Sequence, residues 1–436
     1  MQKSAKPLED YHKNQKSVLR AWLLYYWANS VYPLVILTAL FPIYYSRSTE
    51  AAFGSEVVNF LGFEVVNTVI YNYSLSFAYL MITLLTPILS GLADYSGLKK
   101  HFLIFFTLVG TIASSSLFFF EGHNLLFGLS FFVIAAIGFS GSHIFYNAYL
   151  PQIATPDKFD RLSAQGFSMG YIGSALMLII CIVVITTPQT FGIPGEDLAT
   201  RIAFFMVGIW WLGFGSISFF YLPHADHRNR VQAATFTHGF RELKTVFSEL
   251  KGLIDLQKFM GAFFLFSTGL QTIIIVATLF AEREIDMEQG LLIGTILIIQ
   301  FVAVGGAYLT SILSHKKGNI FALITCLIIW SAICVAAFFV HTATTFMILA
   351  AFVGLVLGGT QAIARSTFSK LLPERKDHNT FFNFYEILEN IARSVGTFSF
   401  ALLETLTGSM RYSAVLLALF FIAGMFLLSL IKDRRL

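Results

Sequence analysis

The stretch SGLADYSGLKK, residues 90–100, is a short polar segment between two long apolar runs. Gly91 and Gly97 permit the backbone conformations of a tight turn. Asp94 can cap a nearby helix N-terminus, while Lys99 and Lys100 can anchor the segment at an anionic membrane surface. The alternative is an ordinary short loop that is kept in place by its positive charge alone. In both cases the pattern predicts two helices joined by a tight connection at the edge of an apolar layer.

Apolar runs like these two recur from one end of the chain to the other. Of its residues 56% are hydrophobic and 12% are charged, whereas soluble domains have about 25% charged residues. A helix of about 20 apolar residues crosses the roughly 30 Å hydrocarbon core of a bilayer. We therefore expect an all-α membrane protein with twelve transmembrane helices, near residues 21–45, 66–89, 102–121, 125–150, 164–187, 201–222, 259–281, 289–313, 319–341, 345–366, 381–403 and 411–431.

Basic residues are distributed very unevenly between the connections. If the N-terminus lies inside, all but five of the 29 Lys and Arg residues fall on the inner side. The exceptions are Arg47, Arg201, Arg283 and Arg411 on the outer side and Arg393 within an expected span. The positive-inside rule then places both termini in the cytoplasm, and we expect a multi-pass protein of a bacterial inner membrane. The formal net charge of +4 reflects this topology and does not indicate nucleic-acid binding.

Sequence motifs for catalysis or metal binding are missing. The chain has no HExxH, GxSxG or P-loop pattern, and Cys181, Cys326 and Cys334 lie within expected spans without metal-ligand spacing. We therefore expect no enzyme activity, no cofactor and no metal site. The expected partners are a small polar solute and the lipid bilayer, and the protein is expected to be a monomer.

The chain divides into two halves of six expected spans each. Residues 1–222 form an N-terminal half, residues 223–258 a cytoplasmic linker, and residues 259–436 a C-terminal half. Apolar residues from Phe240 to Ile254 recur at helical spacing in the linker, which predicts an amphipathic helix on the inner leaflet or, alternatively, a regulatory docking helix. The second half has a degraded copy of the opening stretch, SILSHKKGN at residues 311–319, which keeps only a basic pair and a glycine. Repeated halves are typical of secondary transporters.

SGLADYSGLKK matches the G-x-L-x-D-x-x-G-x-K-K loop of the major facilitator superfamily, and the chain resembles members of that superfamily. Three further stretches resemble its "unknown major facilitator" branch, which is related to fungal vacuolar amino-acid effluxers. They are YYWANSVYPLVILTALFPIYY from residue 25, YNAYLPQIA from residue 146 and GGTQAIARSTFSKLLP from residue 358. Tyr26 and the segment 388–390 stand where this branch often has an aspartate and a small-glycine-lysine run.

The resemblance implies the major facilitator fold and alternating access to a central cavity. In that fold the two halves are related by a pseudo-twofold axis along the membrane normal, with spans one, four, seven and ten around the cavity. The resemblance also implies that residues 91–100 act as a cytoplasmic latch. We expect its Asp94 to dock near Asn379–Phe381, at the start of span eleven, in one of the two end states.

Several polar side chains could line such a cavity. Tyr25, Asn29 and Tyr32 are spaced i, i+4, i+7 and share one face of span one. Single amides occur in spans seven, eight and ten, at Gln271, Gln300 and Gln361. We interpret these six residues as substrate-binding; the alternative is that they only form hydrogen bonds between helices.

Span eleven has three charged residues in an otherwise apolar stretch. Glu386, Glu389 and Arg393 are spaced i, i+3, i+7 and share one helical face. A charge at the bilayer centre costs about 2.5–3.5 kcal/mol, so this face should not meet lipid. Glu389 and Arg393 can pair at i, i+4. We predict that Arg393 binds substrate and that Glu386 and Glu389 take part in proton coupling; the alternative is a buried triad that only joins helices.

Together these features predict a secondary active transporter that moves a small polar solute by alternating access. Carboxylates within a span favour proton coupling, and the resemblance favours amino acids as the solute. A facilitative uniporter or an exporter of sugars or other metabolites would fit the same residues. A channel or a receptor fits less well, because the chain has neither pore-lining repeats nor a sizeable soluble domain.

Overall fold

The computed structural model describes residues 13–55, 57–224, 252–372, 379–407 and 410–432, and these form two compact units. The first unit takes in Met1–Tyr149 and Ile172–Phe236, and the second takes in Leu150–Tyr171 and Thr237–Leu436. Leu150–Tyr171 thus belongs to the second unit, although it lies before residue 222. The predicted boundaries at residues 222 and 259 stay a prediction. Most of the predicted linker helix, from Phe240, lies outside the described residues.

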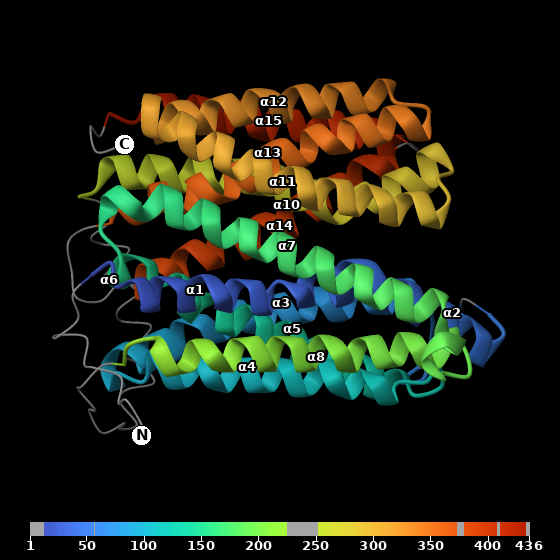
Figure 1. The fold of residues 1–436 in the computed structure, drawn as a ribbon. Coiled ribbons are helices and arrows are strands. Elements are labelled where there is room, and N and C mark those ends of the chain that lie inside the picture. The colour runs from blue at the N-terminus through green and yellow to red at the C-terminus, as the bar shows by residue number, and fades with distance from the viewer. Residues whose placement is uncertain (1–12, 56, 225–251, 373–378, 408–409, 433–436) are drawn as a thin grey trace. The chain divides into compact units, whose positions relative to one another are not determined.

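The first unit is built from long helices and one small hairpin (Figure 1). Its first span is helical from Lys16 to Phe53 and includes a π-helical stretch that begins just before Pro33. Its elements are α1 Lys16–Asn29, η2 Tyr32–Leu40, α2 Phe41–Phe53, β1 Val57–Phe60, β2 Phe63–Val66, α3 Asn67–Ser96, α4 Lys99–Ser116, η3 Leu117–Phe119, α5 Leu125–Asn147, η5 Pro188–Phe191 and α8 Glu196–Tyr221, with the C-terminal part of α7 Phe159–Thr186.

The second unit contains the remaining helices. Within it α11 packs on α13, and α12 lies beside α15 (Figure 1). Its elements are α6 Leu150–Ile153, η4 Pro156–Lys158, the N-terminal part of α7, α10 Ile254–Ile285, α11 Gln289–Lys317, α12 Asn319–Phe339, α13 Ala343–Leu371, α14 Asn379–Thr407 and α15 Met410–Ser429.

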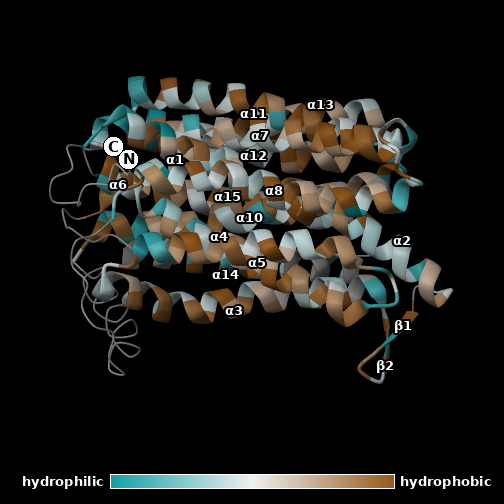
Figure 2. Ribbon diagram, turned by 60° about the horizontal axis from the view of Figure 1, so that its bottom comes forward, coloured by the Kyte–Doolittle hydropathy of each residue, from teal (hydrophilic) through white to brown (hydrophobic). Residues whose placement is uncertain are grey.

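The structure is mostly helical, as predicted, and hydrophobic residues occur along the length of the helices (Figure 2). Among the described residues, ten helices are long and apolar enough to cross a membrane. The other two predicted spans coincide with α3 and α14. In α14 the run of apolar residues is interrupted by Glu386, Glu389 and Arg393. The predicted number of twelve spans stays a prediction.

The prediction of an all-α protein missed the hairpin between α2 and α3. Strands β1 and β2 pair antiparallel, with Val58 opposite Val65 and Phe60 opposite Phe63. Leu61 and Gly62 form the turn with φ values of 52° and 88°, a left-handed conformation that suits glycine. The β-branched residues on both sides favour strands over helix. Figure 2 shows the hairpin extending from one end of the helices of the first unit.

Close helix packing in the second unit depends on a glycine. A Cβ atom on Gly306 of α11 would overlap the carbonyl oxygen of Leu355 on α13, whereas a Cβ on the neighbouring Gly305 would meet nothing within 4 Å. The two backbones can approach this closely only because position 306 has no side chain. Small residues allow the same close approach between transmembrane helices in general.

An ion pair at one end of the second unit joins three helices. Arg411, at the start of α15, donates to the Glu284 carboxylate at 2.9 Å and to the carbonyl oxygens of Phe338 and Val340. The Arg411 and Glu284 side chains are only 13% and 18% exposed. This pair therefore ties α15 to the last turn of α10 and to the end of α12.

We expect Arg411→Met to lower the free energy of unfolding by about 2 kcal/mol or more, because a largely buried carboxylate loses its charged partner and two carbonyls lose a donor. Arg47→Met is a matched control, since Arg47 and Glu196 lie 3.4 Å apart with side chains 70% and 57% exposed. Exposed pairs of this kind contribute little. The apparent melting temperatures of both variants in one detergent provide the test. Equal melting temperatures would show that the buried pair does not stabilise the second unit.

Candidate functional site

The charged face of α14 meets a polar side chain of α10. The Glu389 carboxylate and the Arg393 guanidinium lie 3.3 Å apart, at the predicted i, i+4 spacing. Gln271 on α10 donates its amide NH to Glu389 at 2.5 Å and accepts a hydrogen bond from Arg393 at 3.3 Å. These three predicted site residues therefore form one network, which we call the α10–α14 network.

Packing on both sides holds the α10–α14 network in place. On the side toward the start of α14, the ring of Tyr385 stacks on Phe263 with centroids 4.0 Å apart and lies 4.9 Å from Phe368. On the other side, a Cβ atom on Gly396 would overlap the Thr272 hydroxyl, so α10 and α14 approach closely there. The network therefore lies between an aromatic cluster and a tight helix crossing along one seam.

The network is largely shielded from its surroundings. Gln271 is 7% exposed, as is Glu386, which lies one turn before Glu389 on the same face. The Glu389 and Arg393 side chains are 18% and 19% exposed. The charges thus meet protein groups and one another, as the cost of placing a charge in lipid requires. An Arg with five donors beside a carboxylate and an amide can exchange one acceptor for another.

The other two amide side chains that were predicted to bind solute lie on α11 and α13 of the same unit. Gln361 on α13 accepts a hydrogen bond from the Tyr171 hydroxyl at 2.6 Å, and Gln300 is buried on α11. Their role in solute binding stays a prediction.

The predicted polar face of span one lies inside the first unit. The Tyr25 hydroxyl shares a hydrogen bond with Thr107 of α4 at 2.7 Å, and the Tyr32 ring packs on Phe139 of α5 and Trp211 of α8. Asn29 is 1% exposed, and neither polar atom of its side chain has a hydrogen-bond partner among the described residues. A role of this face in solute binding also stays a prediction.

The predicted latch, residues 91–100, spans the end of α3, a short turn and the start of α4. Gly97 has a φ of 67°, a left-handed conformation that suits glycine, whereas Gly91 lies within α3 and not in the predicted turn. The Lys99 ammonium lies 4.2 Å from the centre of the Tyr149 ring, and Lys100 donates to the Leu222 carbonyl at 2.9 Å. Both lysines therefore bind protein groups of the first unit, and their anchoring to lipid stays a prediction.

Part of the latch prediction falls outside what the structure describes. Gly91 and Asp94 lie on α3, but the surroundings of their side chains are outside the described part, as are those of Asn379. The docking of Asp94 near Asn379–Phe381 stays a prediction.

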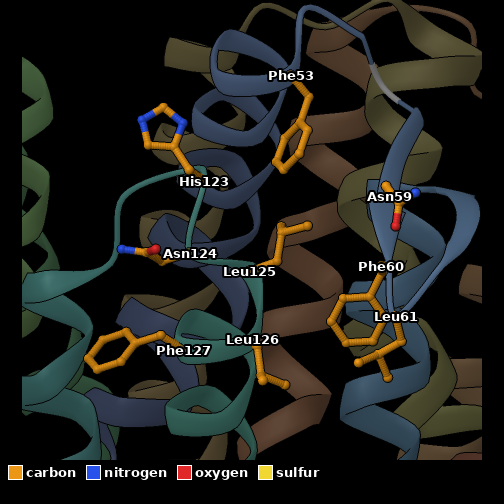
Figure 3. A pocket seen from close by; sticks show the side chains of 9 residues that line it. All are labelled: Phe53, Asn59, Phe60, Leu61, His123, Asn124, Leu125, Leu126 and Phe127. Atoms are coloured by element: carbon orange, nitrogen blue, oxygen red, sulfur yellow. The ribbon is translucent and has the colours of Figure 1, made fainter.

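A cavity of about 300 Å³ lies beside the hairpin of the first unit (Figure 3). The hairpin and the start of α5 line it, together with Phe53, and it contains none of the predicted site residues. The lining residues are Phe53, Asn59, Phe60, Leu61, His123, Asn124, Leu125, Leu126 and Phe127. Across the described ranges, no group of three His, Cys, Asp or Glu side chains could hold a metal ion.

Sequence reasoning missed one buried cluster, at the start of α7. Asp160 lies there among polar side chains of α11, α12 and α13. In the sequence, Asp160 lies close to the basic residues Lys158 and Arg161, as in an ordinary solvated connection between helices. No signal in the sequence therefore singles out Asp160.

Comparisons with known proteins identify the family of the chain. Residues 14–435 match the family described as "Vacuole effluxer Atg22 like". The chain is 32% identical to the "Uncharacterized MFS-type transporter YxiO" of Bacillus subtilis, over 95% of this chain and 94% of that protein. It is 24% identical to "Autophagy-related protein 22" of Yarrowia lipolytica, over 85% of this chain and 77% of that protein.

Solved structures of low sequence identity share the fold. The human organic anion transporter MFSD10 matches with a TM-score of 0.71 and 12% identity, covering 96% of this chain and all of that one. The transporter FucP in its outward conformation matches with a TM-score of 0.70 and 13% identity, covering 96% of this chain and 98% of that one. The chain therefore belongs to the Atg22-like family of major facilitator superfamily transporters, which are not enzymes.

Proposed function

We propose that this protein is a secondary active transporter that moves a small polar solute by alternating access, with amino acids as the first class to test. The family description "vacuole effluxer" and the transporter relative from Bacillus subtilis support transport as such. The uneven distribution of basic residues supports cytoplasmic termini and a bacterial inner membrane. A monomer suffices for this mechanism.

The observation that carries the proposal is the α10–α14 network. A charged side chain at the bilayer centre costs about 2.5–3.5 kcal/mol, and charged residues within spans have partners or mark functional sites. Glu389 and Arg393 pair with each other and with Gln271, yet hydrophobic residues could join two helices without that cost. The presence of these charged groups therefore favours a role in the transport cycle.

The network offers a way to couple solute transport to the uptake and release of a proton. Protonation of Glu389 removes its negative charge and frees a donor of Arg393. A solute carboxylate can then take the place of Glu389 as the acceptor, with the Gln271 amide beside it. Release of the solute would restore the pair and return the proton. Glu386, buried one turn away, is a second group that could exchange protons along this face.

Purified protein in proteoliposomes tests the proposal. Uptake of individual radiolabelled amino acids and of sugars is measured with and without an imposed pH gradient, and protein-free liposomes serve as the control. We expect saturable uptake of at least one amino acid that the pH gradient accelerates. Counterflow exchange without any effect of the gradient would favour uniport, and uptake confined to sugars would overturn the assignment to amino acids.

A further inference from the structure

Asn29, the last residue of α1, has a polar side chain inside the first unit. It is 1% exposed, and neither its side-chain oxygen nor its side-chain nitrogen has a hydrogen-bond partner within the part of the chain that the structure describes. The Tyr32 hydroxyl, on the same face of the first span, is also buried without a partner there. Burial of an unpaired polar group is unfavourable, and native proteins rarely leave one without a hydrogen bond. A molecule bound between the helices would supply the missing partners.

Aromatic contacts with α5 show which groups surround Asn29. Tyr25, one turn before Asn29, stacks on Tyr146 with ring centres 5.3 Å apart. Tyr32, almost one turn after it, packs on Phe139 with ring centres 5.6 Å apart. Because the contact on α5 moves back from 146 to 139 as the first span advances from 25 to 32, the two helices run antiparallel here. The side chain opposite Asn29 therefore comes from the middle of this interval of α5.

The middle of that interval is polar. Ser142 lies there and is 0% exposed. Its hydroxyl donates to the Phe139 carbonyl oxygen at 2.8 Å, so the Ser142 oxygen can still accept a hydrogen bond. The Tyr25 hydroxyl lies close to the Ser142 and Trp211 side chains, and the ring of Trp211, on α8, is 5.8 Å from that of Tyr32. Polar groups of three helices therefore converge at the level of Asn29.

There is also room for a small molecule beside this turn of the first span. A Cβ atom on Gly215 of α8 would meet Tyr25 and Ala28 at 3.8 and 3.9 Å, which are ordinary contact distances. A methyl group would therefore fit at this position, and glycine leaves the room to another small group. A water molecule is similar in size to a methyl group. The surroundings of Asn29 are thus polar and roomy, as a buried water requires.

We propose that the first unit encloses a hydration site, at which the Asn29 amide and the Tyr32 hydroxyl bind ordered water between the first span, α5 and α8. A buried water makes about three hydrogen bonds to polar groups that would otherwise be unpaired. The Asn29 side chain offers a donor and an acceptor, and the Tyr32 hydroxyl offers one of each. The site lies where α1 is followed by the π-helical stretch η2, and π-helical turns often occur at functional positions.

Hydroxyl-radical labelling by X-rays tests the hydration site, because radicals formed from a bound water oxidise the side chains next to it. Oxidation of each residue is measured by mass spectrometry on the purified wild-type protein in detergent. No solute is added, so the labelling reports on water whether or not the protein is a transporter. We expect Tyr32 and Trp211 to be oxidised at least about tenfold faster than equally buried aromatic residues that have hydrogen-bond partners.

Tyr149 and Trp22 are the matched controls for this experiment. Both lie in the first unit and are as buried as the test residues, at 1% and 0% exposure. The Tyr149 hydroxyl and the Trp22 indole NH donate to backbone carbonyl oxygens at 2.9 and 3.1 Å. Opening of the helices would label all four residues, whereas a hydration site labels Tyr32 and Trp211 in preference. Equal oxidation rates for the test and control residues would overturn the proposal.

Two variants of Asn29 separate water binding from burial. Asn29→Leu has no side-chain polar atom to hold water, so oxidation of Tyr32 is expected to fall to the rate of Tyr149. Asn29→Ser keeps a hydroxyl and leaves more room, so this oxidation is expected to stay within about twofold of the wild-type rate. A folded Asn29→Leu protein with the wild-type oxidation rate at Tyr32 would also overturn the proposal. If Asn29→Leu does not fold, the comparison within the wild-type protein decides.

Discussion

Replacing Glu389 by glutamine is expected to reduce pH-gradient-driven uptake at least about tenfold while counterflow exchange continues. The glutamine oxygen can still accept the hydrogen bond from Gln271, and the neutral side chain resembles protonated Glu389, so solute can still bind beside Arg393 and exchange. The glutamine side chain can no longer take up and release a proton, so the pH gradient can no longer drive the transport cycle through this residue. Both activities are measured in proteoliposomes with the solute that the wild-type protein transports.

Glu121→Gln is the matched control for this experiment. Glu121 also pairs with an arginine, Arg201 at 2.8 Å, but its side chain is 56% exposed and lies outside the network. We expect its driven uptake to equal that of the wild type. Unchanged driven uptake in Glu389→Gln would rule out its role in proton coupling, and loss of folded protein would support a triad that only joins helices.

Replacing Gly306 by alanine should destabilise the second unit by about 3 kcal/mol, because the added methyl group would overlap the backbone of α13 and force the two helices apart. Alanine normally stabilises a helix by roughly 0.5–1 kcal/mol relative to glycine, so the expected change has the opposite sign to the intrinsic preference. The apparent melting temperature and the yield of monodisperse protein are the measurements.

The neighbouring glycine provides the control. A Cβ on Gly305 meets nothing within 4 Å, so Gly305→Ala is expected to be neutral or slightly stabilising. If Gly306→Ala has the same apparent melting temperature as Gly305→Ala, the close contact between α11 and α13 does not contribute to stability.

The length of the apolar runs was enough to predict most of the helices, because one run of about 20 residues makes one span whatever its neighbours are. The hairpin was missed for a local reason. Val57 to Val66 is a short segment between two strong helical patterns, and its valines and Gly62 favour a hairpin. Grouping of Leu150–Tyr171 with the second unit depends on tertiary contacts, which no local pattern encodes.

The candidate site was predictable only along single helices. The pairing of Glu389 with Arg393 follows from their spacing, since i, i+4 side chains are neighbours on any helix. Gln271 and Glu389 are 118 residues apart in the chain. Only the packing of α10 on α14 brings these two side chains together. Asp160 shows the same limit, because its partners Ser314, Asn319 and Lys370 come from three other helices.

Equilibrium binding of the transported solute to Arg393→Gln tests the central claim, that the α10–α14 network is where the solute binds. A hydrogen bond to a charged group contributes about 1.5–3 kcal/mol, so we predict a dissociation constant at least about tenfold larger than that of the wild type. An unchanged dissociation constant in a folded Arg393→Gln protein would contradict the claim and place the solute elsewhere.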